Sequence, residues 1–107
     1  MAVYVDDMNA PFRGMIMSHM LADSTEELLK MADTIGVQRK WIQYPNTHRE
    51  HFDIALSKKH LAIEAGAIEV TWRQIAIMER RRRLEGVLGL PDETEEWYKA
   101  NGLHNLT

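Results

Sequence analysis

The sequence predicts a single small α/β domain, in which a sheet of about four strands is covered by three helices and followed by a short C-terminal acidic helix. Two observations predict this class. Short apolar runs rich in β-forming residues alternate along the chain with segments of helical periodicity, a pattern typical of sheets packed against helices. The chain of 107 residues is long enough for one domain with a modest core, and 45% of its residues are hydrophobic, as in ordinary globular proteins.

Two strands and a loop are predicted at the start of the chain. Residues 2–6 form a continuous run of β-formers, as in a strand buried on both faces. Residues 9–14 are rich in turn formers and predict a loop. Residues 15–21 are apolar except at two positions and predict a second strand. Because side chains alternate along a strand, His19 shares a face with Met17.

The first helix has clear start and stop signals. Ser24 and Glu27 form a capping box, in which the serine accepts the amide proton of the glutamate and the glutamate reaches back. Apolar residues then recur at helical spacing as far as Ile35, and Gly36 suits the left-handed residue that ends a helix. Asp23 lies just before the helix, near the positive end of its dipole.

The middle of the chain predicts a third strand and a second helix. Residues 37–43 contain bulky apolar side chains and predict the strand, and residues 44–50 form a polar loop after it. An extended segment at residues 51–54 follows. The second helix is expected from about Ser57 to Ala65, with Gly66 as its stop.

A fourth strand, residues 67–70, leads into a third helix that Thr71 caps. Glycines and a proline then break the chain before a short acidic helix at residues 92–100. The predicted α/β domain therefore covers residues 1–84, and residues 85–107 form a C-terminal extension.

Composition excludes several classes of site. The chain has no cysteine, which excludes disulfides, thiolate zinc sites and cysteine nucleophiles and fits a reducing cytoplasm. No apolar run is long enough to span a membrane, and the start of the chain lacks the features of a secretory signal. We therefore expect a cytoplasmic protein without a membrane partner.

Charge is unevenly distributed along the chain. The net charge of −3 gives no general reason to expect nucleic-acid binding, but Arg80–Arg83 form a basic block and residues 92–96 an acidic one. The basic block has three interpretations: a solvated helix end matched to the dipole, a partner for the acidic helix within one chain or in a homo-oligomer, or a nucleic-acid contact. The third is the weakest, because the block is isolated.

Two short segments carry most of the chemical information. Residues 18–23 (SHMLAD) and 51–53 (HFD) each place a histidine within four residues of an aspartate. Histidine titrates close to working pH, so beside carboxylates it can serve as a base, an acid or a metal ligand. His51 and Asp53 share one side of an extended segment, which suits either two metal ligands or a base with its orienting carboxylate. The alternative is a polar turn anchored by Phe52.

The remaining polar candidates also have two interpretations each. His19 is either a site residue or a half-buried histidine bonded to a backbone carbonyl, and Asp23 either orients it or caps the following helix. Asp6, in the Asp6–Asp7 pair, ends a buried strand. There it can hold a hard cation such as magnesium or cap local amides. Because ligands bind beyond the carboxyl ends of strands in α/β sheets, these aspartates fall where a site is expected.

The start of the second helix predicts an anion contact. If Ser57 caps this helix, Lys58 and Lys59 occupy its first turn, where cations are unfavourable unless an anion binds. If the helix begins earlier, at Asp53 or Ile54, the lysines are solvated.

With these residues placed, the chain resembles an uncharacterised family of small bacterial and phage proteins, a domain of unknown function. The resemblance covers about residues 1–84. The family commonly has tyrosine where this chain has Phe52, so a phenol is not essential there unless Tyr44 or Tyr4 substitutes. The resemblance transfers no activity and implies a bacterial or phage cytoplasmic origin. The matching segments are Val3–Asp6, Ser18–Met20, Ala22–Asp23, Glu27–Leu28, Trp41, His51–Asp53 and Gly66–Ala67. The resemblance to this family also implies that five residues belong to one pattern: Asp6, His19, Asp23, His51 and Asp53.

The leading hypothesis is a polar pocket that binds a small anionic ligand, such as a nucleotide or phosphate ester, and that could hydrolyse it. The catalytic candidates are His19, His51 and Asp53. The ligand-binding candidates are Asp6, Asp23, Ser57 and Lys58. A divalent metal ion, if one is needed, would take its ligands from Asp6, His19, His51 and Asp53.

A non-enzymatic protein is the main alternative, either an inhibitor or an oligomer that sequesters its ligand. Nucleic-acid binding through Arg80–Arg83 is a weaker one. The distance between the imidazole rings of His19 and His51 decides whether the two residues can share one site.

Overall fold

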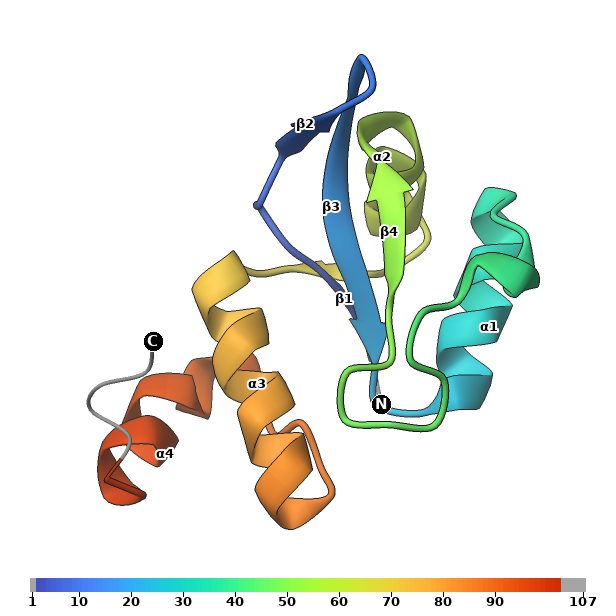
Figure 1. Ribbon diagram of the computed structural model, residues 1–107. Helices are drawn as coiled ribbons and strands as arrows, with labels where there is room; N and C mark the ends of the chain where they lie inside the picture. The colour runs from blue at the N-terminus through green and yellow to red at the C-terminus, as the bar shows by residue number, and fades with distance from the viewer. Residues whose placement is uncertain (1, 103–107) are drawn as a thin grey trace.

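The computed structural model describes residues 2–102 and contains a mixed sheet of five strands with four α-helices (Figure 1). This confirms the predicted α/β class. Residues 103–107 of the predicted extension lie outside the described part. The strands are β1 (Val3–Val5), β2 (Ala10–Phe12), β3 (Met15–Ala22), β4 (Phe52–Ala55) and β5 (Ile68–Glu69). The helices are α1 (Thr25–Ile35), α2 (Leu56–Glu64), α3 (Trp72–Glu85) and α4 (Thr94–Ala100), with 3-10 turns η1 (Arg39–Trp41) and η2 (Pro91–Glu93).

Strand β3 is the centre of the sheet. Its C-terminal half pairs antiparallel with β1, its N-terminal half pairs with β2, and β4 runs antiparallel along its other edge. Strand β5 pairs parallel with β1. In the β3–β4 ladder, His19 lies opposite Asp53 and Met20 lies opposite Phe52. Because side chains alternate, these two pairs point to opposite faces of the sheet.

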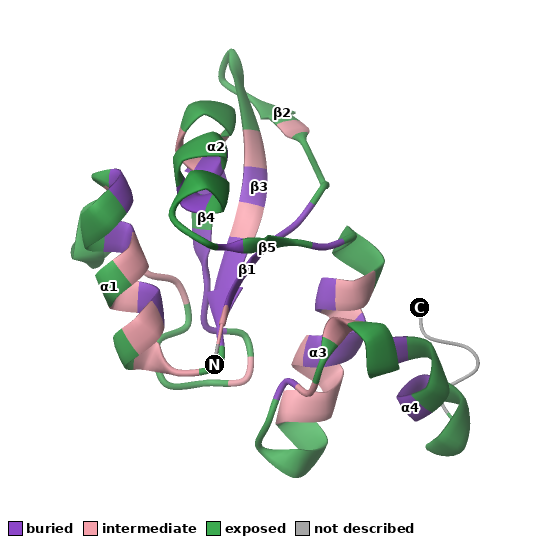
Figure 2. Cartoon of the chain, turned by 180° about the vertical axis from the view of Figure 1, so that it is seen from behind, coloured by how far each residue is buried: buried purple, intermediate pink, exposed green. Residues whose placement is uncertain are grey.

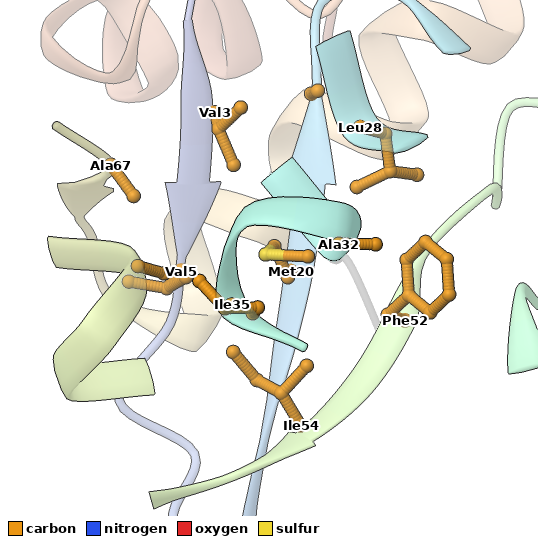
Figure 3. Close-up of a cluster of buried hydrophobic side chains, with 11 residues drawn as sticks. Val3, Val5, Met20, Leu28, Ala32, Ile35, Phe52, Ile54 and Ala67 are labelled. Carbon is orange, nitrogen blue, oxygen red and sulfur yellow. The ribbon is translucent and has the colours of Figure 1, made fainter. Parts of the chain in front are cut away.

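The two faces of the sheet have separate cores. Helices α1 and α2 cover one face, and α3 covers part of the other (Figures 1 and 2). The larger cluster lies under α1 and α2, with Phe52, Met20 and Ile54 from the sheet packed against Leu28 and Ala32 of α1 (Figure 3). Tyr4 and Leu21 belong to the second face, where they pack against Ile75 and Met78 of α3.

Both predicted helix caps are present. Ser24 accepts the amide proton of Glu27 at 3.2 Å and donates its hydroxyl to the carboxylate of the same residue. Thr71 and Gln74 form a complete capping box at the start of α3. Gly36 ends α1 with a φ of 79°, in the left-handed region that favours glycine.

We expect Gly36→Ala to lower the free energy of unfolding by about 1–2 kcal/mol, because a Cβ is strained at this φ. The added atom would also lie 3.2 Å from Nζ of Lys58, so that side chain must shift slightly. Gly86→Ala should lose a similar amount from the strain alone, since Gly86 has a φ of 83° with no atom near its Cβ position, so any extra loss in Gly36→Ala comes from the Lys58 contact. Urea denaturation of both variants would measure the difference. A Gly36→Ala protein as stable as the wild type would contradict this account.

The predicted third strand at residues 37–43 is wrong. The segment contains the 3-10 turn η1, and its one strand-like feature is an isolated bridge from Gln43 to His51. Two consecutive cations, Arg39 and Lys40, interrupt the apolar run, and Arg39 pairs with Asp33 on α1 at 2.7 Å. Trp41 is 61% exposed, so its bulk does not indicate a buried strand.

The predicted loop at residues 9–14 contains a strand that sequence analysis missed. Pro11 fits β2 because this strand lies at an edge of the sheet, where a missing amide donor is tolerated. Arg13 and Gly14 have φ values of 50° and 79° and form the tight turn between β2 and β3. The hairpin tip is exposed (Figure 2).

The described part of the extension packs against the outer side of α3. Trp97 and Tyr98 form a small cluster with Ile77. Arg73 pairs with Glu95 at 2.6 Å and Arg81 pairs with Glu93 at 3.3 Å, so basic and acidic segments meet within one chain. Among residues 2–102, no helix combines the length and the hydropathy needed to cross a membrane.

Candidate functional site

Three strand segments bring the predicted histidines and two aspartates together on the face of the sheet that α3 partly covers. His19 and Asp53 face each other across β3 and β4, and His51 comes just before β4. Asp6 follows β1, where its amide donates to the carbonyl of His19 at 3.1 Å. The two imidazole rings lie 5.3 Å apart between centroids, in an edge-on arrangement. We call His19, His51, Asp53 and Asp6 the histidine cluster.

Asp6 is completely buried, and both of its carboxylate oxygens have hydrogen-bond partners. Its Oδ1 accepts the amide protons of His19 and Met8 at 2.9 and 3.2 Å, and its Oδ2 lies 2.7 Å from Nδ1 of His19. Burial opposes ionisation, but the hydrogen bonds from the imidazole and the two amides outweigh it, so the pKa of Asp6 lies below its usual value. The hydrogen bond to Asp6 is also the main cause of the raised pKa of His19.

Asp53 lies between the two histidines. Its Oδ1 is 3.4 Å from Nε2 of His51 and 3.7 Å from Nε2 of His19, while its Oδ2 accepts a short hydrogen bond from Gln43 at 2.5 Å. The contact with His51 is the main cause that lowers the pKa of Asp53. Burial lowers the pKa of His51, but Asp53 and the carbonyl of Arg49 outweigh burial and raise it.

The loop before His51 is held rigidly, which fixes the position of that imidazole. Glu50 is buried and accepts hydrogen bonds from the hydroxyl of Thr25 and the amide of Asn46. Arg82 on α3 donates to the carbonyl oxygens of His48 and Glu50 and also to Ala22 at the end of β3. One member of the predicted basic block therefore ties α3 to this loop.

This arrangement can perform two kinds of chemistry. One ring nitrogen of His19, one of His51 and a carboxylate oxygen of Asp53 all lie within 4.8 Å of one another, so they could hold a metal ion. Alternatively, either imidazole could move protons, because each has a carboxylate beside it.

The comparison with family models gives one match, to the family described as "Protein of unknown function (DUF4031)", over residues 3–82. The chain belongs to this family. The match spans β1 to most of α3 and includes the whole histidine cluster, whereas α4 lies outside it. No curated protein and no solved structure matches the chain.

Within the DUF4031 region, Asp23 is not joined to His19. Its Oδ2 accepts the amide proton of Ala2 at 2.7 Å, and its Oδ1 lies 3.4 Å from the hydroxyl of Tyr4. Burial, and then the charge of Asp23, raise the pKa of Tyr4 to about 12. Asp23 therefore fastens the start of β1 instead of orienting the imidazole.

Ser57 and Lys58 are also separated from the histidine cluster. Helix α2 begins at Leu56 with Ala55 as its N-cap, so Ser57 does not cap it, contrary to the prediction. Nζ of Lys58 lies beside Gly36, at the C-terminal end of α1 where cations are favoured. Helix α2 packs in the larger core, on the face of the sheet opposite His19.

Several basic side chains lie together along one side of α3 and on the loop before His51. A cavity of about 570 Å³, which we call the arginine cavity, is formed between one side of α3 and the loop before His51. Its lining residues are His48, Arg49, Trp72, Arg73, Ala76, Glu79, Arg80 and Arg83. The run Arg80–Arg83 is the sequence feature that could have indicated this cavity, but the sequence alone does not show that Arg49 lies on the opposite wall of the same cavity. A smaller cavity of about 270 Å³ borders His19 and Asp53.

Proposed function

We propose that the protein binds a small phosphate-bearing anion in the arginine cavity and hydrolyses it at the histidine cluster. The observation that carries this proposal is the convergence of unpaired arginines on one cavity beside paired histidines. Arg49, Arg80 and Arg83 all line the cavity, and within residues 2–102 no carboxylate forms an ion pair with any of them.

Arg39, Arg73 and Arg81 pair with carboxylates, and Arg82 donates to backbone carbonyls. Arg13 has no carboxylate partner, but it lies over the ring of Phe12 at the hairpin tip, and Arg49 lies over the ring of Tyr44 at 4.2 Å. Among residues 2–102, three of the four arginines without a carboxylate or carbonyl partner therefore line the cavity. Guanidinium is the side-chain group best suited to phosphate, because its planar donors form two parallel hydrogen bonds with phosphate oxygens.

The arginine cavity adjoins the histidine cluster through two residues. Glu79 lines the cavity, and its carboxyl interacts electrostatically with both His51 and His19. Burial raises the pKa of Glu79, whereas the charges of His51, Arg82, His19 and Arg49 act in the opposite direction. Arg49 also lines the cavity, and its carbonyl oxygen lies 2.5 Å from Nδ1 of His51.

Hydrolysis of a phosphate ester requires a bound phosphate, an attacking water molecule and a proton for the leaving group. The oxygen of a water molecule forms a bond to phosphorus, the bond from phosphorus to the ester oxygen breaks, and the leaving oxygen takes up a proton. The histidine cluster would activate the water, whose proton passes to solvent, and the leaving oxygen would take its proton from solvent. The arginines would neutralise the charge on the phosphoryl oxygens.

Replacing both Arg80 and Arg83 with alanine tests the ligand site. We expect the dissociation constant for inorganic phosphate to rise at least tenfold, because two charge-assisted contacts are lost. Wild-type affinity should also fall as salt is raised. Titration calorimetry would measure both effects. Arg13→Ala is the matched control, since Arg13 is also unpaired with a carboxylate but lies at the distant hairpin tip. Unchanged affinity in the double variant would refute the arginine cavity as the ligand site.

Replacing both His19 and His51 with alanine tests the reaction. We expect the release of 4-nitrophenol from 4-nitrophenyl phosphate to be abolished while circular dichroism still shows a folded domain. Full turnover in this variant would refute the histidine cluster as the reaction site. Phosphate binding without turnover in the wild type would instead support the alternative of a non-enzymatic, ligand-sequestering protein.

A further inference from the structure

The two histidines of the cluster have the same hydrogen-bonding pattern. Nδ1 of His19 is 2.7 Å from the buried carboxylate of Asp6, and Nδ1 of His51 is 2.5 Å from the carbonyl oxygen of Arg49. A carbonyl oxygen and an ionised carboxylate can only accept hydrogen bonds, so each Nδ1 carries the proton. In a neutral imidazole, the lone pair is then on Nε2.

The two Nε2 atoms face a third acceptor, which is Oδ1 of Asp53. The separations from His51 and His19 are 3.4 and 3.7 Å. Both exceed the roughly 2.7–3.2 Å that usually separates the nitrogen and oxygen atoms of an N–H···O hydrogen bond in proteins. Three electron-rich atoms that face one another are unfavourable unless a proton or a metal ion lies among them.

The separations agree with those between ligands of a tetrahedral metal ion. With metal–ligand bonds of roughly 2.0–2.1 Å, two ligand atoms of a tetrahedron lie about 3.3–3.4 Å apart. One ring nitrogen of each histidine and a carboxylate oxygen of Asp53 also lie within 4.8 Å of one another. A shift of these side chains would bring three ligand atoms around one ion.

We propose that Nε2 of His19, Nε2 of His51 and a carboxylate oxygen of Asp53 bind a divalent transition-metal ion of the zinc class. Two imidazoles select such an ion over magnesium or calcium, which prefer oxygen ligands. The ion's catalytic role rests on the proposed hydrolysis, for which it would supply an activated water. Its binding is independent of any substrate.

Three protein ligands leave at least one coordination position open, as in catalytic zinc sites. His19 and Asp53 also border a cavity of about 270 Å³, and the side chain of Asp53 is 38% exposed, so solvent can reach this ligand. A closed structural site would need a fourth protein ligand, and the described residues supply no further histidine or carboxylate to this group.

Asp6 is a positioning residue in this site and not a ligand. Both of its oxygens are already used, one by two backbone amides and the other by Nδ1 of His19. A carboxylate behind a metal-binding histidine fixes the tautomer and the ring orientation, and its loss typically weakens metal binding about 10–100-fold. The carbonyl of Arg49 does the same for His51.

Asp6→Asn gives a sharp test of this role. Its side-chain oxygen must stay on the two amide protons, so its NH₂ group would point at Nδ1 of His19 and donate to it. The proton of the imidazole would then move to Nε2, which could no longer bind a metal ion. We expect Asp6→Asn to lower the affinity for metal about 10–100-fold with the domain still folded.

The decisive experiment is titration of the metal-free, full-length protein with Zn²⁺ alone by calorimetry, and with Co²⁺ by visible absorption. We expect one ion per chain in the wild type and a cobalt spectrum of low coordination number. His51→Gln and Asp53→Asn should each weaken binding at least tenfold. His60→Gln is the matched control, because His60 is exposed on α2, and it should bind like the wild type.

Failure to bind one equivalent of either ion would overturn the proposal. So would unchanged affinity in His51→Gln and Asp53→Asn, or a loss confined to His60→Gln. The two proposals fail separately. Metal binding without ester hydrolysis would refute the proposed function but support the metal site. Hydrolysis by a protein that binds no metal would refute the metal site but support the proposed function.

Discussion

Replacing Asp6 with alanine should lower the free energy of unfolding by about 3–5 kcal/mol, because hydrogen-bond donors around a fully buried carboxylate lose their acceptor. The carboxylate is fully buried and accepts hydrogen bonds from two backbone amides and one imidazole. Alanine leaves the amides of His19 and Met8 without an acceptor, at a cost of about 1–3 kcal/mol for each group that stays buried. The change would be visible in urea or thermal denaturation as a large fall in midpoint.

Asp6→Asn separates the hydrogen bonds from the charge. Asparagine retains an oxygen for both amide protons, so we expect it to recover more than half of the stability that alanine loses. A variant with alanine at position 6 and near-wild-type stability would show that water enters and satisfies the amides. The ordered connection between β1 and β3 at this point would then contribute little to the fold.

Replacing Phe52 with alanine is the second change for which we expect a loss of about 3–5 kcal/mol, because it removes a large ring from a packed core. Phe52 has no exposed surface, and it lies opposite Met20 in the β3–β4 ladder. Its ring packs in the cluster beneath α1, near Ala32 (Figure 3). Chemical denaturation would measure the loss.

Two further substitutions at this position distinguish volume from polarity. Phe52→Leu keeps most of the apolar volume and should cost clearly less than alanine. Phe52→Tyr restores the residue common among the proteins that this chain resembles, and it should cost about 1–3 kcal/mol if its hydroxyl finds no partner in the core. Equal stability of the alanine and leucine variants would mean that the core collapses around the smaller side chain. In every case the metal affinity should persist in molecules that remain folded, since Phe52 is on the opposite face.

Local signals in the sequence were enough for the starts of α1 and α3 and for the placement of His51 and Asp53 on one side of the chain. Ser24 and Thr71 each begin a helix because a hydroxyl can satisfy an amide at the helix start, which depends on a few neighbouring residues alone. Period-two alternation put His51 and Asp53 on one side of the chain before any tertiary contact was known. The alternation does not predict which side chain lies opposite each residue on the neighbouring strand.

The misses share one cause, which is that tertiary contacts overrode local preference. Residues 37–43 have strand-forming side chains but no strand to pair with, whereas Pro11 lies in a strand because an edge position tolerates it. Ser57 was expected to cap α2, but the preceding strand β4 runs directly into the helix, which starts one residue earlier. The arginine cavity depends on how α3 lies against a loop more than twenty residues away in sequence, and no spacing rule reports that.

The register between β3 and β4 has a consequence for how this protein could misfold. His19 opposite Asp53 and Met20 opposite Phe52 are adjacent rungs of one ladder, so a slip by one residue would exchange the faces of all the side chains of the slipped strand. Such a slip would expose an aromatic ring and disrupt the cluster in the same event. A misassembled chain would therefore be recognisable to proteases and chaperones as unfolded, and folded molecules with a scrambled site should not accumulate in a cell.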